Sequence, residues 1–124
     1  MAVPATVSVT ASASGRVVVV SLVGEHDLSS AEHLRRTLLE LSSHVSLIVL
    51  DFDQTTFVDS SVLGVFAGAC KRAAKHGNSM IGVNARGIVL RALTMTGIDA
   101  VLSMPVPVGE LEQELSALLD RPHH

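Results

Sequence analysis

The residues most suited to chemistry form a short polar stretch near the middle of the chain, Asp59-Ser60-Ser61. A serine hydroxyl attacks a substrate only when a general base lies within reach, and it can instead accept phosphate from a kinase. The chain has no Gly-x-Ser-x-Gly elbow, no Walker loop, and no His-x-x-x-His or Cys–His spacing suited to zinc. We therefore expect neither an enzyme nor a metal site. The stretch is either a phosphorylation site or a helix cap followed by two polar residues.

This polar stretch lies where a strand is expected to lead into a helix. An apolar run at 46–52 is typical of a buried strand, and after a short polar loop a helix is expected from Ser60 to about His76. Asp59 suits the N-cap, because its carboxylate can accept hydrogen bonds from the free N–H groups of the first turn. Ser60 is then expected near the exposed tip, where the positive end of the helix dipole tolerates an anion. A phosphate on Ser60 could therefore be held without unfolding the chain.

Strand-like and helix-like segments alternate along the rest of the chain. The expected strands are 6–10, 17–23, 46–52, 79–83 and 100–102, and the first two are expected to pair as an antiparallel hairpin. One helix is expected to begin at a cap on Ser29 or Ser30 and to end near Ser42, and further helices are expected at 60–76, 89–96 and 109–119. This order predicts a single α/β domain in which a mixed sheet of four or five strands packs with about four helices.

The composition fits one soluble domain with an aliphatic core. Of the 124 residues, 48% are hydrophobic and 2% aromatic, and the net charge is −3. The scarcity of aromatic rings and the negative charge argue against nucleic acid binding. Cys70 stands among alanines and is interpreted as a small apolar core residue. We see no leader and no apolar run of the ~18 residues that a membrane span needs. We therefore expect a cytoplasmic protein with a domain at 6–119 and loose tails at 1–5 and 120–124.

Two motifs resemble a known bacterial family. One reads Phe57-Val58-Asp59-Ser60-Ser61-Val62-Leu63-Gly64, and the other reads Val23-Gly24-Glu25-His26-Asp27. The first resembles the phosphorylation motif of the anti-sigma-factor antagonists, which are built on the STAS domain. The second resembles the Gly-Glu-Leu-Asp signature of the same family. The resemblance extends over about residues 5–119. The sequence departs from the family at Val62, where glycine is usual, and at His26, where leucine is usual.

The resemblance implies a regulatory switch. It implies that Ser60 is the phospho-acceptor and that Asp59, Ser61 and Asp27 belong to the partner-binding surface. It also implies that the partner is an anti-sigma factor with serine kinase activity, which uses ATP and Mg²⁺, and that a phosphoserine phosphatase reverses the modification. The unphosphorylated form would bind the anti-sigma factor and free its sigma factor, and the phosphorylated form would dissociate. The chain itself would hold no cofactor and catalyse no reaction.

The roles of a valine and of two glycines in the helix that follows Ser60 stay open. Valine at position 62 either improves the helix or blocks the kinase. Glycines spaced four apart, Gly64 and Gly68, would let another element approach the helix closely.

Two rival functions also stay open. A small-ligand-binding module would need basic side chains near Ser60, whereas Lys71, Arg72 and Lys75 are expected at the far end of the helix. A non-phosphorylated interaction subunit of a transport or stress complex would be favoured by an exposed apolar patch around Met95, Ile98 and Met104.

Overall fold

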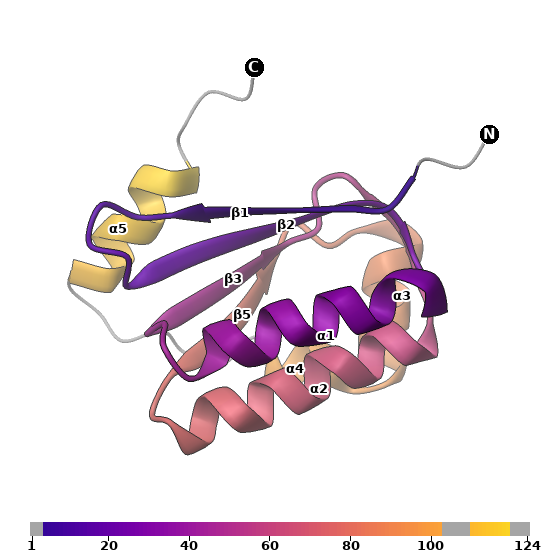
Figure 1. Cartoon of the computed structure of the whole chain (residues 1–124). Coiled ribbons are helices and arrows are strands. Elements are labelled where there is room, and N and C mark those ends of the chain that lie inside the picture. Colours follow the sequence, from indigo (N-terminus) through magenta and orange to yellow (C-terminus); the bar gives the residue numbers. More distant parts are fainter. Residues whose placement is uncertain (1–3, 103–109, 120–124) are drawn as a thin grey trace.

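The central strand of the fold is the β-branched run that begins at Val17. Figure 1 shows the computed structural model, which describes residues 4–102 and 110–119. Its strands are β1 (Thr6–Ala11), β2 (Val17–His26), β3 (Leu47–Asp51), β4 (Thr55–Val58) and β5 (Ser79–Val83). Its helices are α1 (Leu28–Ser42), α2 (Ser60–Lys75), α3 (Gly87–Met95), α4 (Ile98–Val101) and α5 (Glu110–Leu119). Helices lie between the parallel strands and cover both faces of a mixed sheet, which confirms the predicted α/β class.

Strand β2 pairs with three other strands. Strand β1 runs antiparallel to it, so the predicted hairpin is confirmed. Strand β3 runs parallel to the first half of β2, with Ser21 opposite Asp51, and β5 continues the sheet beyond β3. Strand β4 runs parallel to the last residues of β2. The described part of the chain therefore forms a mixed sheet of five strands.

Side chains that alternate along β2 divide the core into two clusters. Val18 and Val20 face a large cluster formed with helices α1 to α4, and Val17 and Val19 face a smaller cluster that includes Leu118 of α5. Figure 1 shows α1 and α2 side by side against one face of the sheet and α5 against the other. A strand buried on both faces reads as a continuous apolar run, which explains the unbroken valines of β2.

Two of the expected elements are wrong. The predicted strand at 100–102 is instead the end of helix α4, which begins after Gly97 in a left-handed conformation with φ of 76°. Only Leu102 reaches the sheet, where its carbonyl accepts a hydrogen bond from the Gly82 N–H at 3.0 Å. The polar loop expected after Phe52 contains strand β4, because Thr55 and its neighbours find a parallel partner in β2. Strand β4 has only four residues and begins with two threonines, so it is too short to show an alternation of polar and apolar residues.

The glycines of α2 are not a site of close approach. An added Cβ at Gly64 or Gly68 would meet no atom within 4 Å, so the expectation that another element packs there is wrong for the described residues. The close approach is at Gly82 of β5 instead. A Cβ there would lie 3.0 Å from Cε2 of Phe52 and 3.3 Å from Cδ1 of Leu102.

Among residues 4–102 and 110–119, no helix combines the length and the apolar character needed to cross a membrane. Residues 1–3 of the expected N-terminal tail and the whole expected tail at 120–124 lie outside the described residues, as does Met104.

Gly68 and Gly82 give a matched pair of predictions about stability. Gly68→Ala should raise the free energy of unfolding by about 0.5–1 kcal/mol, because alanine suits an open helical position better than glycine. Gly82→Ala should lower it by about 1–3 kcal/mol, because the buried Phe52 ring is held edge-on against Phe66 and cannot move aside. Urea unfolding of both variants beside the wild type measures the difference. Equal effects of the two substitutions would contradict the packing described here.

Candidate functional site

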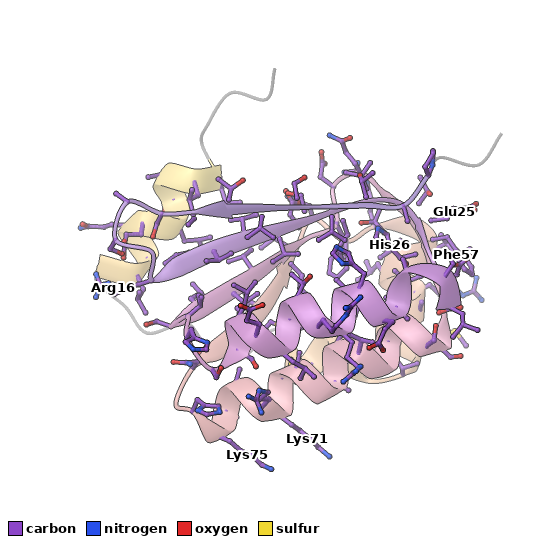
Figure 2. The ribbon with its side chains drawn as sticks, viewed as in Figure 1. Arg16, Glu25, His26, Phe57, Lys71 and Lys75 are labelled. Atoms are coloured by element: carbon purple, nitrogen blue, oxygen red, sulfur yellow. The ribbon has the colours of Figure 1, made fainter. Side chains whose placement is uncertain are left out.

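The ends of strands β2 and β4 bring both sequence motifs together. Glu25 lies opposite Phe57 and His26 opposite Val58, and the Asp59 N–H donates to the His26 carbonyl at 3.2 Å. Figure 2 shows Glu25, His26 and Phe57 at the end of the molecule where α1 and α2 begin. The residues that follow these strands, Asp27 and Asp59, therefore stand at neighbouring helix starts.

Gly24 lets β2 reach this position. Its φ is 87°, a left-handed conformation that glycine adopts without strain. The register between β2 and β4 shifts between Gly24 and Glu25, and the Gly24 N–H donates to the Gln54 carbonyl at 2.9 Å. The irregularity resembles a β-bulge, which bends a strand and redirects its side chains. The glycine of the second motif is thus explained by the backbone.

Asp27 is the N-cap of α1. Its Oδ1 accepts hydrogen bonds from the Ser29 N–H at 2.9 Å and the Ser29 hydroxyl at 2.6 Å. These bonds hold the pKa of Asp27 below its ordinary value, although the nearby charge of Asp59 acts in the opposite direction. The expectation that Ser29 or Ser30 caps this helix is wrong, because the helix begins at Leu28 and the cap precedes it.

Asp59 is the N-cap of α2, as predicted. Its Oδ1 accepts from the Ser61 hydroxyl at 2.5 Å and from the Val62 N–H at 3.1 Å. The Ser61 hydroxyl is the main reason that the pKa of Asp59 lies below its ordinary value, and the backbone N–H groups of Val62 and Leu28 add to it. Because Leu28 begins α1, the N-termini of both helices stabilise this one carboxylate.

The two serines after Asp59 differ in availability. Ser61 is half-buried, and its hydroxyl is bound to Asp59. Ser60 is exposed, and in the part of the chain that the structure describes its hydroxyl makes no hydrogen bond. The side chain of Val62 is fully buried, so it lies away from the surface around Ser60. The open hydroxyl at this helix start is therefore that of Ser60.

Large apolar side chains lie beside the two carboxylates. Leu28, which follows Asp27, is 76% exposed, and Phe57, two residues before Asp59, is 37% exposed. Helix α3 contacts β4 and carries a third such residue, Ile88, at its start. The sequence reasoning missed all three. The spacing of Leu28 to Ala31 matches the buried face of α1, so only the structure reveals that the first turn extends beyond the core.

His26 is buried directly below this surface. Its side chain is fully buried, with Nε2 at 3.1 Å from the Val23 carbonyl and Nδ1 at 3.2 Å from the Ser30 hydroxyl. Burial lowers the pKa of His26 below its ordinary value of 6.5, and this effect exceeds the opposing effects of the Val23 carbonyl and the Asp27 charge. His26 is therefore stable in the neutral form.

The other candidate residues lie elsewhere. Figure 2 shows Lys71 and Lys75 at the opposite end of α2 from Phe57, as the sequence predicts. Burial raises the pKa of the Cys70 thiol to about 11, which favours the unreactive thiol form. Met95 is exposed but Ile98 is buried, so the apolar patch that would favour an interaction subunit does not include Ile98.

Comparisons with known proteins agree with this arrangement. The family model described as "STAS domain" matches residues 8–114. The anti-sigma-B factor antagonist of Bacillus subtilis (strain 168) is 29% identical over 85 residues, which cover 68% of this chain and 78% of that protein. An anti-sigma factor antagonist from Mycobacterium paratuberculosis has a similar structure, with a TM-score of 0.68 and 24% identity over 94% of this chain and 96% of that one. The Bacillus cell fate determinant SpoIIAA in the phosphorylated form has a TM-score of 0.65 and 19% identity, with 93% of this chain and 99% of that one covered.

The lowered pKa of the buried His26 predicts that the protein loses stability in mild acid. Because its pKa is lowered in the folded state, its contribution is complete above the unfolded pKa of 6.5 and is lost as the pH falls below that value. The limiting slope for one proton is about 1.4 kcal/mol per pH unit. Urea unfolding at pH 7.5 and 5.5 should therefore show a larger decrease for the wild type than for His26→Leu.

A matched control for that prediction is His33→Gln, which changes an exposed histidine of α1. This variant should keep the decrease of the wild type. If His26→Leu loses as much stability between the two pH values as the wild type does, the titrating group is not His26.

Proposed function

The chain belongs to the STAS domain family, and from this we propose that it acts as an anti-sigma-factor antagonist. In this role it binds an anti-sigma factor with serine kinase activity and frees the sigma factor which that protein holds. The observation that carries the proposal is the exposed, unbonded hydroxyl of Ser60 beside Asp59, at the point where both sequence motifs meet. The function is binding in the cytoplasm, and the chain catalyses no reaction and needs no cofactor.

The unphosphorylated surface has the features of a protein-binding site. Leu28 and Phe57 provide exposed apolar area, and aromatic residues often supply a large share of interface energy. Asp27 directly precedes Leu28 and Asp59 follows Phe57 by two residues, and both offer charged acceptors. Carboxylates held by their own helix caps are already oriented, so a partner does not have to order them. A basic partner surface with an apolar pocket would complement this arrangement.

Ser60 is the proposed phospho-acceptor because it alone of the two serines is available. Transfer of phosphate to Ser61 would first have to break its 2.5 Å hydrogen bond to Asp59, and with it part of the cap of α2. Transfer to Ser60 disturbs no described hydrogen bond. SpoIIAA in its phosphorylated form has a structure similar to that of this chain. This similarity supports the proposal that the fold tolerates phosphorylation. The buried Val62 leaves the approach to Ser60 open, which favours the helix-forming explanation of that residue.

Phosphate on Ser60 would repel the partner through charge. It adds about −1.5 to −2 charges at neutral pH, next to Asp59 and close to Asp27. The N-terminus of α2 offsets part of this charge, by about 0.3–1 kcal/mol, so the helix start should persist. A partner that had matched two carboxylates would then have to desolvate a phosphate dianion as well. A loss of about 3 kcal/mol of binding energy corresponds to a decrease in affinity of about 100-fold or more. A phosphoserine phosphatase would restore binding.

The rival functions have less support. Binding of an anionic ligand at Ser60 would need cations there, and the basic end of α2 lies at the opposite end of that helix (Figure 2). A non-phosphorylated interaction subunit would use an apolar patch around Met95. Ile98 is buried and therefore cannot contribute to that patch.

The proposed switch predicts a difference between single substitutions in binding. Wild type, Ser60→Ala, Ser60→Asp and Ser61→Ala are used as baits in lysate of the source organism. Wild type, Ser60→Ala and Ser61→Ala should capture an anti-sigma factor with a kinase domain. Ser60→Asp should capture it about 100-fold less well, because it adds charge at the interface.

The captured kinase then tests the acceptor directly. With Mg²⁺ and ATP it should phosphorylate wild type and Ser61→Ala and leave Ser60→Ala unmodified. Phosphate on Ser60→Ala would show that the acceptor is another residue. Equal capture by all four baits, with no kinase among the captured proteins, would overturn the switch.

A further inference from the structure

The face of the sheet opposite α1 and α2 carries polar side chains at its centre. Strand register places Ser8 opposite Ser21 and Ser21 opposite Asp51, so these three residues form one row across β1, β2 and β3. Directly paired residues point to the same face, and this row shares its face with Val19, which packs against α5. Figure 1 shows α5 over one end of this face. The polar row lies next to the part that α5 covers.

A cavity of about 360 Å³ opens over this polar row. Its polar lining consists of the hydroxyls of Ser8, Thr10 and Ser21, the Gln54 amide and the Asp51 carboxylate. Its apolar lining includes Val19 and Val23 of the sheet and Leu118 of α5. Sites for small molecules commonly have volumes of about 300–1,000 Å³ and combine apolar walls with a few polar groups.

Asp51 is the unusual member of the lining. It is only 7% exposed, and its Oδ1 accepts hydrogen bonds from the Asp53 N–H and from Asn84 Nδ2, both at 3.0 Å. No hydrogen bond of the described residues involves its other oxygen, and no ion pair involves its charge. The nearby Asp53, by contrast, pairs with Arg86 at 3.2 Å. A carboxylate that is largely withdrawn from water and has no cation beside it would be stabilised by a positive group that reaches its free oxygen.

We infer that this cavity binds a small aliphatic amine. The ammonium group takes the free oxygen of Asp51, with the hydroxyls of Ser8 and Ser21 as further acceptors. Its methylene chain lies along Val19 and Leu118. An ammonium ion has three donors and no acceptor, which matches a site rich in oxygen atoms with one uncompensated negative charge. The same charge excludes phosphates and nucleotides, so the site is chemically distinct from a modified Ser60.

The inference is independent of the proposed function. Ser60 and the polar row lie on different elements, and the row faces the side of the sheet that α1 and α2 do not cover. An amine site can exist whether or not Ser60 is phosphorylated.

The test uses 1,4-diaminobutane as the probe and 1,4-butanediol as a neutral control of the same length. Both are titrated into the full chain and followed by ¹H–¹⁵N NMR and calorimetry. We expect saturable binding of the diamine, with the shifted amides clustered at residues 8, 21, 51 and 54. The diol should bind at least ~10-fold more weakly, because it lacks the charge. Absence of saturable diamine binding overturns the inference, and equal binding of the diol overturns the assignment of the ligand as an amine.

Two variants locate the site and one controls for net charge. Asp51→Asn should weaken diamine binding at least ~10-fold, and Ser21→Val should do the same by filling the cavity with a residue that suits a strand. Glu40→Gln removes the same charge from an exposed position of α1 and should bind as the wild type does. The NMR spectra check that each variant is folded, and Ser21→Val decides the question if Asp51→Asn unfolds. Wild-type affinity in a folded cavity variant overturns the inference.

Discussion

The site depends on the pairing of the end of β2 with β4, and above all on the hydrogen bond from the Asp59 N–H to the His26 carbonyl. This contact joins segments that are more than thirty positions apart in the chain and brings two helix starts together. Strand β2 pairs with β3 as far as Ser21 and with β4 from Gly24, and the left-handed backbone of Gly24 permits the shift in register against β4 that follows it. The two sequence motifs thus pair with each other in one strand contact.

This contact brings the carboxylates of Asp27 and Asp59 near each other, and no ion pair among the described residues involves either of them. The helix starts stabilise both. Each carboxylate accepts hydrogen bonds from the first turn of its own helix, and Asp59 is further stabilised by the Leu28 N–H of the other. The positive ends of the helices therefore already stabilise these two carboxylates and could offset only part of a further negative charge. Any further anion on this surface would meet the negative charges of Asp27 and Asp59. This balance is consistent with the proposal that one phosphate on Ser60 would act on a partner while leaving the fold in place.

The two faces of the sheet have different chemical roles. The face toward α1 to α4 is filled by aliphatic side chains and by Phe52 and Phe66. The other face is apolar only where α5 covers it and becomes polar beyond it, at Ser21 and Asp51. With a phosphorylation site at the starts of α1 and α2 and a cavity for a small cation on the opposite face of the sheet, the domain would respond to phosphorylation and to a cation independently.

The sequence by itself determined the class of the fold, the cap of α2 and the exposed position of Ser60 at the start of that helix, because apolar periodicity and capping are local properties of the chain. It did not reveal β4 or the burial of Asp51, since both depend on partners far away in the sequence. It also misassigned the segment around Ala100, where an apolar run fits a short strand and a buried helical turn equally well. Only the tertiary structure decided that the Ser61 hydroxyl binds Asp59 while that of Ser60 makes no hydrogen bond among the described residues, and that Leu28 and Phe57 are exposed. The reason is physical: a residue's type and spacing state what it can do, whereas its availability depends on which neighbours the whole fold brings to it.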